Sequence, residues 1–485
     1  MTTERLHESM DEWNKKVAAA EEMIPLIGSL FRERAIETSI FGRLLNNRTV
    51  INIIKCCRFA RQVDAKELDV EDVHAVLQAV YVLAPELSPC HIDLGKIAAN
   101  YQRLSGGQPL RDYVHSELAN AIGNHPVEDS ETDIVLYGFG RIGRLLAREL
   151  IAKSGSKAAM RLRAIVVRQG SDNDLLKRAS LLRRDSVHGS FNGTITVDHE
   201  HNAIIANGQH IQVIYSNSPS EIDYTHYGIH DAVVVDNTGK WRDRDGLSQH
   251  LACPGVKRVL LTAPGKGDLK NIVHGVNHDE ITDDDTIISA ASCTTNAITP
   301  VLKAIADKYG IRNGHVETVH SYTNDQNLID NFHKGDRRGR AAALNMVITE
   351  TGAASAVAKA LPELKGKLTG NAIRVPTPNV SMAILNLNLD NPVDREELNE
   401  YLRLVAVHSK LQKQIDYSNS PEAVSTDFVG SRAAGIVDGL ATIAAGYNSC
   451  VVYVWYDNEY GYSCQVIRCL RQMTKATLPA YPATQ

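Results

Sequence analysis

The sequence GFGRIG at residues 138–143 constrains the fold of this chain more than any other feature. It follows the apolar segment 134–137 and opens a run with helical spacing over 144–152. In such a strand–turn–helix unit the first glycine permits a tight turn, the second lets the backbone approach a pyrophosphate, and the third allows close helix packing. The pyrophosphate is then held by free N–H groups at the helix N-terminus. Glycines also cluster in ordinary turns, but this context predicts a dinucleotide-binding domain.

Further apolar segments alternate with helical or loop segments after this unit. They lie at 162–167, 232–236, 259–262 and 286–290. Strands that alternate with helices are typical of a doubly wound, mostly parallel sheet. The sequence therefore predicts an α/β fold with a Rossmann-like domain.

Size, charge and cysteine usage limit the remaining classes of protein. A length of 485 residues predicts two or three domains. The net charge of −5 and the pI near 6.4 provide no overall attraction for nucleic acid or for an anionic membrane. The sequence shows no signal peptide and no run near the roughly 18 apolar residues that span a bilayer. The eight cysteines have no CxxC pair and no metal-ligand spacing, so we expect reduced thiols, no metal and a cytoplasmic protein.

Residues 1–130 have a different texture, with apolar residues at helical spacing and no clear strand. Asp69 is a candidate helix N-cap, the stretch 106–109 breaks the helical pattern, and 125–130 is typical of a linker. We expect an all-α extension of three to five helices, whose apolar stripes form a core or a partner-facing surface. The stripes are Trp13, Val17, Ile24, Ile27 and Phe31, and then Val73, Val76, Leu77, Val80 and Tyr81.

The end of the second strand bears on the choice between NAD and NADP. An NAD-specific site usually has an acidic residue about 20 residues after the glycines, where it bonds the ribose 2′-hydroxyl. Here the segment 164–170 reads AIVVRQG and contains no acid. Arg168 is placed to meet a 2′-phosphate, which favours NADP or dual use. The alternative is that Arg168 points to solvent while another group holds the hydroxyl.

Cys293 is the candidate nucleophile. It lies between the strand at 286–290 and a helix that continues to about residue 309. At a helix N-terminus the macrodipole and the unpaired N–H groups favour a thiolate over a thiol. Considered alone, a cysteine at such a junction is more often a small buried residue.

The neighbouring motifs resemble those of the phosphorylating glyceraldehyde-3-phosphate dehydrogenase family. The sequence SCTTN at 292–296 is similar to the nucleophile motif of that family. Further similar segments follow in family order: VHSYTND at 319–325, DRRGR at 336–340, TGAA at 351–354, RVPTPN at 374–379 and WYDNE at 455–459. The resemblance runs from about residue 133 to the C-terminus and does not include residues 1–130.

The resemblance implies a covalent mechanism. Cys293 attacks the aldehyde carbon to give a thiohemiacetal, and His320 forms an ion pair with the thiolate and then accepts the hydroxyl proton as a hydride leaves for the nicotinamide. The Cys293 N–H supports the developing oxyanion. Inorganic phosphate then intercepts the resulting thioester.

The resemblance also implies two anion sites and a set of cofactor contacts. Thr323, Asp325, Arg338 and Arg374 are similar to the residues that hold the substrate phosphate. Ser292, Thr294, Thr351, Gly352 and Arg374 are similar to the residues that hold inorganic phosphate. Because an anion beside phosphate repels it, we expect Asp325 to orient Arg338. The expected cofactor contacts are Gly138, Gly140, Arg141, Ile142, Gly143, Arg168, Thr238, Gly239, Thr262, Asn458 and Tyr462.

The predicted function is oxidation of glyceraldehyde 3-phosphate with NAD or NADP and inorganic phosphate to 1,3-bisphosphoglycerate, in glycolysis or gluconeogenesis. One alternative is an enzyme similar to erythrose-4-phosphate dehydrogenase. Another alternative is that the extension is a protein-interaction or regulatory module. The competing interpretation of the extension is a helical cap that stabilises the assembly. The expected architecture is a helical extension (1–130), a dinucleotide-binding domain (131–292 with 458–485) and an α+β catalytic domain (293–457). The resemblance implies a homo-oligomer, a tetramer in the family. From the charge and the apolar runs we expect no nucleic-acid partner and no membrane partner.

Overall fold

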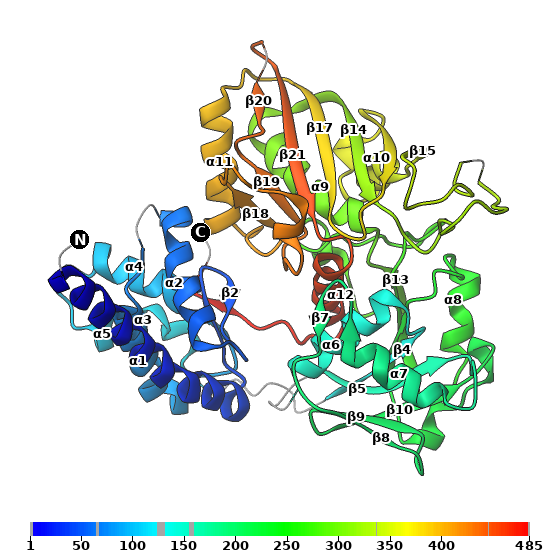
Figure 1. The fold of residues 1–485 in the computed structure, drawn as a ribbon, viewed down its shortest axis with the longest axis horizontal. Coiled ribbons are helices and arrows are strands. Elements are labelled where there is room, and N and C mark those ends of the chain that lie inside the picture. The colour runs from blue at the N-terminus through cyan, green and yellow to red at the C-terminus, as the bar shows by residue number, and fades with distance from the viewer. Residues whose placement is uncertain are drawn as a thin grey trace.

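The structure is a computed structural model that describes residues 3–64, 67–123, 131–154, 160–335, 337–444 and 446–483. Figure 1 shows three bodies: a mainly helical one formed by the N-terminal residues, and two others that are each built on a large sheet. The linker predicted at 125–130 lies outside the described residues.

The first large sheet has the doubly wound order β13-β12-β11-β4-β5-β10-β9-β8. The six strands from β13 to β10 are parallel, and β9 and β8 continue the sheet in antiparallel fashion. Because the strand order reverses on either side of β4, the carboxyl end of β4 lies at the switch point where such sheets bind ligands. The strands are β4 (Thr132–Tyr137), β5 (Met160–Val167), β8 (Ile195–Asp198), β9 (Ala203–Ala206), β10 (Gln209–Tyr215), β11 (Ala232–Asp236), β12 (Val256–Leu261) and β13 (Ile287–Ser289). The predicted Rossmann-like fold is confirmed.

Helices cover this sheet and bring the end of the chain back to it. They are α6 (Arg141–Ala152), α7 (Asp174–Arg183), α8 (Arg244–Leu251) and α12 (Tyr460–Met473), with the short strands β6 (Arg184–Asp185) and β7 (Gly189–Ser190) after α7. Leu146 and Leu150 of α6 share one core with Val466 and Leu470 of α12. Helix α12 therefore packs with α6 in the core of the nucleotide-binding sheet.

The second large sheet is mixed and follows the order β15-β16-β14-β17-β21-β19-β18, with β20 paired to β21. Every second residue of β17 is buried, as expected for a strand with one face on a core. Buried side chains of α9, including Ile298 and Val301, pack in that core. The elements are α9 (Cys293–Tyr309), β14 (Ile311–Ser321), β15 (Val347–Glu350), α10 (Ala353–Ala360), β16 (Leu368–Val375), β17 (Ser381–Leu389), α11 (Arg395–His408), β18 (Ile415–Ser418), β19 (Gly435–Asp438), β20 (Ile443–Ala444) and β21 (Ser449–Tyr456).

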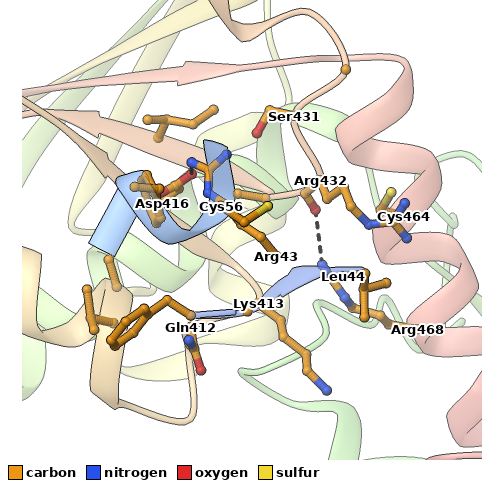
Figure 2. Close-up of a pocket in the computed structure, with 18 of the residues that line it drawn as sticks. Arg43, Leu44, Cys56, Gln412, Lys413, Asp416, Ser431, Arg432, Cys464 and Arg468 are labelled. Carbon is orange, nitrogen blue, oxygen red and sulfur yellow. Dashed lines mark hydrogen bonds and ion pairs between the residues drawn. The ribbon is translucent and has the colours of Figure 1, made fainter. Parts of the chain in front are cut away.

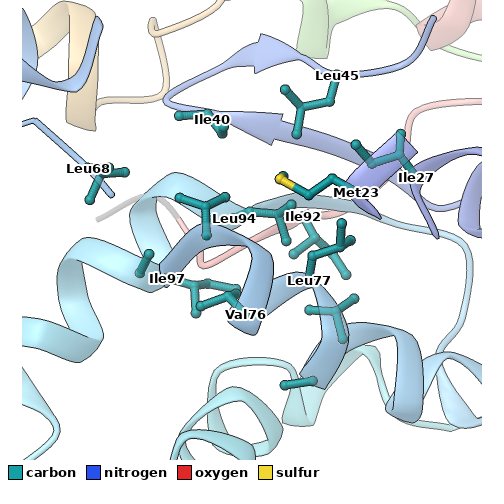
Figure 3. Close-up of a cluster of buried hydrophobic side chains, with 14 of the residues drawn as sticks. Met23, Ile27, Ile40, Leu45, Leu68, Val76, Leu77, Ile92, Leu94 and Ile97 are labelled. Carbon is teal, nitrogen blue, oxygen red and sulfur yellow. The ribbon is translucent and has the colours of Figure 1, made fainter. Parts of the chain in front are cut away.

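The extension has its own hydrophobic core, part of which Figure 3 shows. Met23 and Ile27 meet Val76 and Leu77 there. The described residues of the extension contain five α-helices, within the predicted range: α1 (Thr3–Arg34), α2 (Val50–Asp64), α3 (Val70–Leu83), α4 (Leu94–Leu104) and α5 (Leu110–Glu117). The Asp69 carboxylate accepts a hydrogen bond from the Glu71 N–H, and the break at 106–109 separates α4 from α5, so both predictions are confirmed.

The expectation of an extension made only of helices was wrong. The extension also contains three short strands, and the tail of the chain adds a fourth, in the order β2-β1-β3-β22. These strands are two to four residues long, and all four residues of β1 are buried. They are therefore too short to show an alternating pattern in the sequence. The strands are β1 (Glu37–Ile40), β2 (Arg43–Leu44), β3 (His91–Asp93) and β22 (Ala480–Tyr481).

Half of the residues in the two apolar stripes are buried. Ile27 and Val73 are buried, whereas Trp13, Ile24 and Tyr81 are 41%, 40% and 40% exposed. No helix in the described ranges has the length and apolarity that crossing a bilayer demands.

Polar groups link the extension to the rest of the chain, and Val407 of α11 also packs in the extension's hydrophobic core. The Glu37 carboxylate forms an ion pair of 2.5 Å with Arg471 of α12, and this partner holds the pKa of Glu37 well below its usual range although burial opposes it. Lys96 donates a hydrogen bond of 2.8 Å to the Gln412 side chain. In Figure 1 the tail that follows α12 crosses to the extension, where β22 pairs with β3.

Candidate active site

Cys293 lies on a turn that the chain enters in a strained conformation. Ala291 follows β13 with a φ of +56°, in the left-handed region that non-glycine residues rarely adopt. The Ser292 hydroxyl then caps α9 by accepting a hydrogen bond of 3.0 Å from the Thr295 N–H. The Tyr462 hydroxyl of α12 donates to the Ala291 carbonyl at 2.9 Å. The turn therefore presents Cys293 as the first residue of α9.

Strand pairing brings His320 and Arg374 to the same place. The two residues are register partners on the parallel strands β14 and β16, so their side chains share a face. His320 Nε2 lies 3.6 Å from Cys293 Sγ. His320 Nδ1 lies 2.7 Å from the Ser321 carbonyl oxygen and 2.6 Å from Arg374 Nη1. In the tautomer in which Nδ1 donates to that carbonyl, Nε2 is the nitrogen that can accept a proton from the thiol.

Burial and a neighbouring cation set the protonation of this pair. Burial, and then the positive charge of Arg374, lower the pKa of His320 to about 3. Burial also raises the pKa of Cys293, although Arg374 and the backbone N–H groups of Thr294 and Cys293 act in the opposite direction. Both shifts disfavour the thiolate–imidazolium pair that the resemblance implies, and they favour a neutral thiol beside a neutral imidazole.

The raised pKa predicts how the reactivity of Cys293 depends on pH. Because the thiolate is the nucleophile, alkylation by iodoacetamide should still be increasing above pH 8.5, near the ordinary midpoint of a thiol. Arg374 stabilises the thiolate, so Arg374→Gln should move the midpoint to still higher pH. Mass spectrometry of the peptide that contains residue 293, over a pH series, measures this.

Arg312→Gln is the matched control for this measurement, because Arg312 is exposed and pairs with Asp390 at the far end of β14. It should leave the midpoint unchanged. A midpoint well below pH 8 in the parent chain would contradict the neutral pair and restore the ion pair expected from the sequence.

Arg374 also presents an unused donor. Its Nη1 contacts the Ser321 carbonyl at 3.0 Å, but its Nε is buried with no hydrogen-bond partner among the described residues. Buried donors are almost always paired, and a guanidinium pairs best with an oxyanion. Arg374 therefore has a free position for an anion beside Cys293.

The other residues of the predicted inorganic-phosphate set are partly engaged in local structure. The Thr294 hydroxyl shares a hydrogen bond of 3.0 Å with the Tyr456 hydroxyl, and Ser292 caps α9. The Thr351 hydroxyl accepts from the Ala353 N–H at 3.2 Å where α10 begins. Gly352 is exposed and is the N-cap of α10.

The predicted substrate-phosphate set is held together by an ion pair. The Asp325 carboxylate pairs with Arg338, the contact expected if it orients this arginine. Arg338 also donates to the Thr349 hydroxyl at 3.2 Å, and its charge contributes to lowering the pKa of Arg374. Thr323 is half-buried in the same segment. Asp336 of the matched motif lies outside the described residues.

The glycine turn after β4 has the shape that a dinucleotide needs. Gly138 has a φ of +93°. A Cβ on Gly143 would lie 2.4 Å from the Gly138 carbonyl oxygen, whereas a Cβ on Gly140 would meet no atom within 4 Å. No side chain caps the start of α6, so its first N–H groups are available to an anion. This open cradle fits a pyrophosphate.

The remaining predicted cofactor contacts lie at the carboxyl ends of the parallel strands. Arg168 follows β5 and is exposed, with no ion pair in the described parts of the chain. The Thr262 hydroxyl donates to the Asp236 carbonyl at 3.0 Å, and the Thr238 hydroxyl donates to the Asp236 carboxylate at 2.7 Å. Gly239 has a φ of +61° in the same turn.

Two predicted contacts differ in their freedom to bind a cofactor. Asn458 is buried, and its side-chain oxygen accepts from the Ser381 hydroxyl at 2.9 Å, so its amide N–H groups remain available. Arg141, beside Ile142 at the start of α6, pairs with Glu459 and with Asp185, the latter at 2.5 Å. Arg141 therefore joins α6 to the turn before α12 rather than pointing freely into the cradle.

Sequence reasoning missed several groups around the site. Tyr456, Ser381 and Asp185 contact predicted site residues, and His188 hydrogen-bonds to Asp457 at 3.1 Å. The motif at 455–459 includes Tyr456 and offered a signal for that residue alone. The others come from distant segments without a motif.

A possible metal-ligand group also escaped the sequence spacing. Asp198, His201 and His210 bring ligand atoms within 4.8 Å of one another on the strands β8 to β10. Asp198 accepts hydrogen bonds from the His201 N–H and from its ring, so the group is already internally satisfied.

The Rossmann-like sheet with its glycine turn lies next to a second body that carries Cys293 at the start of α9 and His320 on β14. This combination defines an NAD-dependent oxidoreductase. Residues 132–244 match the family model of the glyceraldehyde 3-phosphate dehydrogenase NAD binding domain, and residues 292–458 match that of the C-terminal domain. The chain belongs to the glyceraldehyde-3-phosphate dehydrogenase family.

Individual relatives divide according to whether they include the extension. A glyceraldehyde-3-phosphate dehydrogenase-like protein of Pseudomonas aeruginosa is 65% identical over 95% of this chain and its own full length, so the similarity takes in most of residues 1–130. Glyceraldehyde-3-phosphate dehydrogenase 1 of Bacillus cereus is 40% identical over 72% of this chain and its own full length. The chloroplastic GAPA1 enzyme of Arabidopsis thaliana is 42% identical over 70% of this chain and 83% of its own.

Proposed function

We propose that the chain is a phosphorylating dehydrogenase that oxidises glyceraldehyde 3-phosphate to 1,3-bisphosphoglycerate. The observation that carries the proposal is the unpaired, buried Nε of Arg374, which lies beside the Cys293–His320 pair. A cysteine–histidine pair alone serves many acyl-transfer reactions. A second, anion-seeking position next to it favours phosphate as the group that accepts the acyl chain.

The first steps use the neutral pair. Cys293 Sγ bonds to the aldehyde carbon as its proton passes to His320 Nε2, and His320 delivers that proton to the carbonyl oxygen, which becomes the hydroxyl of a thiohemiacetal. The N–H groups at the start of α9 point toward the sulfur and stabilise charge that develops there and on the adjacent oxygen. His320 then accepts the hydroxyl proton, and a nicotinamide bound over the glycine turn would supply the acceptor for the hydride that leaves the same carbon. Cys293 is left as a thioester.

Phosphate completes the turnover. A phosphate oxygen held by Arg374 bonds to the thioester carbon, the carbon–sulfur bond breaks, and the acyl phosphate leaves while Cys293 is regenerated. The low pKa of His320 suits this sequence, because the imidazolium formed in the oxidation loses its proton readily. Arg338, oriented by Asp325, holds the phosphate that the substrate already carries.

The dependence of the rate on inorganic phosphate tests the proposal. With glyceraldehyde 3-phosphate, cofactor reduction should saturate with phosphate and fall at least about tenfold without it, because water is a poorer acceptor than a bound oxyanion. Rates measured with NAD and with NADP give the cofactor preference; the exposed, unpaired Arg168 supports use of NADP as well as NAD.

Arsenate in place of phosphate is the matched control, because it has the same charge and shape and should restore cofactor reduction. A phosphate-independent rate would contradict phosphorylation. If it came with faster turnover of erythrose 4-phosphate, the alternative substrate with water as acceptor would replace the proposal.

We also propose that the chain assembles with copies of itself in the cytoplasm, as a tetramer by family resemblance. Apolar side chains between β14 and β15 are open to solvent, among them Phe332, Leu344 and Leu328 at 90%, 83% and 79% exposure. In Figure 1 this segment reaches away from the catalytic body. Such a patch needs a cover, and a second copy is the partner that is always present. All eight cysteines are free thiols, which suits a reducing compartment.

A further inference from the structure

A cavity of about 510 Å³ lies between the extension and the rest of the chain. Strands β1 and β2 and helix α2 form one wall, and the segments 412–418 and 427–433 with helix α12 form the other. Figure 2 shows Arg43, Lys413 and Arg468 gathered around it. The volume is in the range of sites for small organic molecules. The cavity is separate from Cys293 and from the glycine turn, neither of which lines it.

The lining is strongly cationic. It contains eight lysine or arginine side chains and three carboxylates. The cations come from both walls: Arg43, Arg48 and Lys55 from the extension, and Lys153, Lys413 and Arg468 among those from the other side. Because the whole chain carries a net charge of −5, this concentration is a local feature rather than a reflection of composition.

Ion pairs account for only part of this charge. Glu37 pairs with Arg471 at 2.5 Å, and Asp416 lies 3.8 Å from Arg43. Arg468 donates only to the Arg432 carbonyl and to the Gln465 side chain, and Lys413 has no ion pair or side-chain hydrogen bond in the described part of the chain. Lys55 and Arg48 likewise face no carboxylate within 4 Å among the described residues. Four cations therefore have no ion-pair partner within 4 Å among the described residues, and Glu37 and Glu149 act on Lys413 and Arg468 only from farther away.

Burial in the cavity and the neighbouring positive charges lower the pKa values of these cations. Desolvation, and then the charge of Arg468, lower the pKa of Lys413 to about 8. Desolvation also lowers the pKa of Lys153 to about 8 and that of Arg468 to about 10. Cations held together in this way repel one another, and an anion between them would relieve the repulsion.

We propose that this cavity binds a small molecule that carries two or more phosphate groups, and that the ligand bridges the extension to the dehydrogenase. Several cations without partners match the charge of a diphosphate better than that of a carboxylate or a single phosphate. Their origin on both walls means that one ligand contacts the two parts at once. The site does not depend on the reaction proposed above.

Isothermal titration of the full chain with pyrophosphate, and separately with ATP, tests the proposal. Saturating NAD and inorganic phosphate, at constant ionic strength, keep the probes out of the dinucleotide and phosphate positions of the active site. We expect one binding event per chain, and the double variant Lys413→Gln, Arg468→Gln should weaken it by about tenfold or more, since it removes two charge-assisted contacts. Tighter binding of ATP than of pyrophosphate would identify a nucleotide as the ligand; the reverse order would identify the diphosphate alone.

The melting temperature without ligand separates a binding role from a structural one. Removing two repelling cations should leave the ligand-free variant as stable as the parent chain or more stable, while the stabilisation by pyrophosphate disappears. Lys55→Gln, on the extension, should also weaken binding and provides the test should the double variant not fold. Lys410→Gln, an exposed lysine outside the cavity, is the matched control and should change nothing.

Three results would overturn the proposal. They are the absence of binding by either probe at millimolar concentration, an unchanged affinity in the double variant and in Lys55→Gln, and an equal loss in Lys410→Gln. An effect of Lys413 and Arg468 without any effect of Lys55 would retain an anion site but refute the bridge to the extension.

Discussion

Replacing Cys293 by serine is expected to lower the rate of phosphate-dependent cofactor reduction by at least about a thousandfold. The hydroxyl is a much weaker nucleophile than the thiol and needs a stronger base. A hydroxyl also holds its proton far more tightly than a thiol, so it provides almost no anion near neutral pH. Steady-state rates with glyceraldehyde 3-phosphate, cofactor and phosphate measure the loss.

The expected loss belongs to the chemical step rather than to folding. Serine is nearly the same size as cysteine, and Cys293 is only partly buried. Titration with the cofactor alone should therefore give the affinity of the parent chain, and the melting temperature should stay close to the parent value. A variant that loses both would show that Cys293 supports the turn rather than the reaction.

Cys253→Ser is the matched control. The Cys253 thiol is buried and donates to the Pro219 carbonyl at 2.9 Å, a hydrogen bond that a hydroxyl can also make. The same atomic replacement there should leave the rate within about twofold of the parent rate. If Cys293→Ser kept a tenth or more of the parent rate, Cys293 would not be the nucleophile, and the proposed reaction would fail with it.

The local features of this fold could be predicted from the sequence. The glycine turn, the strands around it and the helix after Cys293 are each encoded by neighbouring residues, so periodicity and motif context predict them. The Asp69 cap and the break at 106–109 are likewise local. Strands β1 and β3 were not predicted because they are short, and β22, which pairs with β3, comes from the opposite end of the chain.

The protonation of the active site could not be predicted in the same way. The helix start gave a reason for a thiolate, but it did not include the burial that raises the pKa of the Cys293 thiol, which packs against the cores of both large sheets. The family resemblance identified His320 and Arg374 as site residues. It did not predict that they contact each other, because that contact depends on the register between β14 and β16. The cationic cavity was hidden for the same reason, since its charges meet only when the extension packs against α12 and the segment before β18.

Gly143→Ala is expected to damage the nucleotide-binding turn severely. The added Cβ would lie 2.4 Å from the Gly138 carbonyl oxygen, a backbone atom that cannot rotate away. Overpacking costs about 1–3 kcal/mol, and the better helix propensity of alanine offsets about 1 kcal/mol of it. Because α6 must move off β4, we expect about a hundredfold loss of cofactor affinity along with a lower melting temperature.

Gly140→Ala separates the steric demands of the fold from those of the ligand. Its Cβ would meet no protein atom within 4 Å, and its φ of −80° suits alanine, so the free protein should melt close to the parent temperature. The methyl group would instead fill space that the pyrophosphate needs, and cofactor affinity should fall. Fluorescence titration and thermal unfolding of the two variants measure both quantities. A Gly140→Ala chain with parent affinity would mean that the dinucleotide does not lie over this turn, and the glycine pattern would then serve helix packing alone.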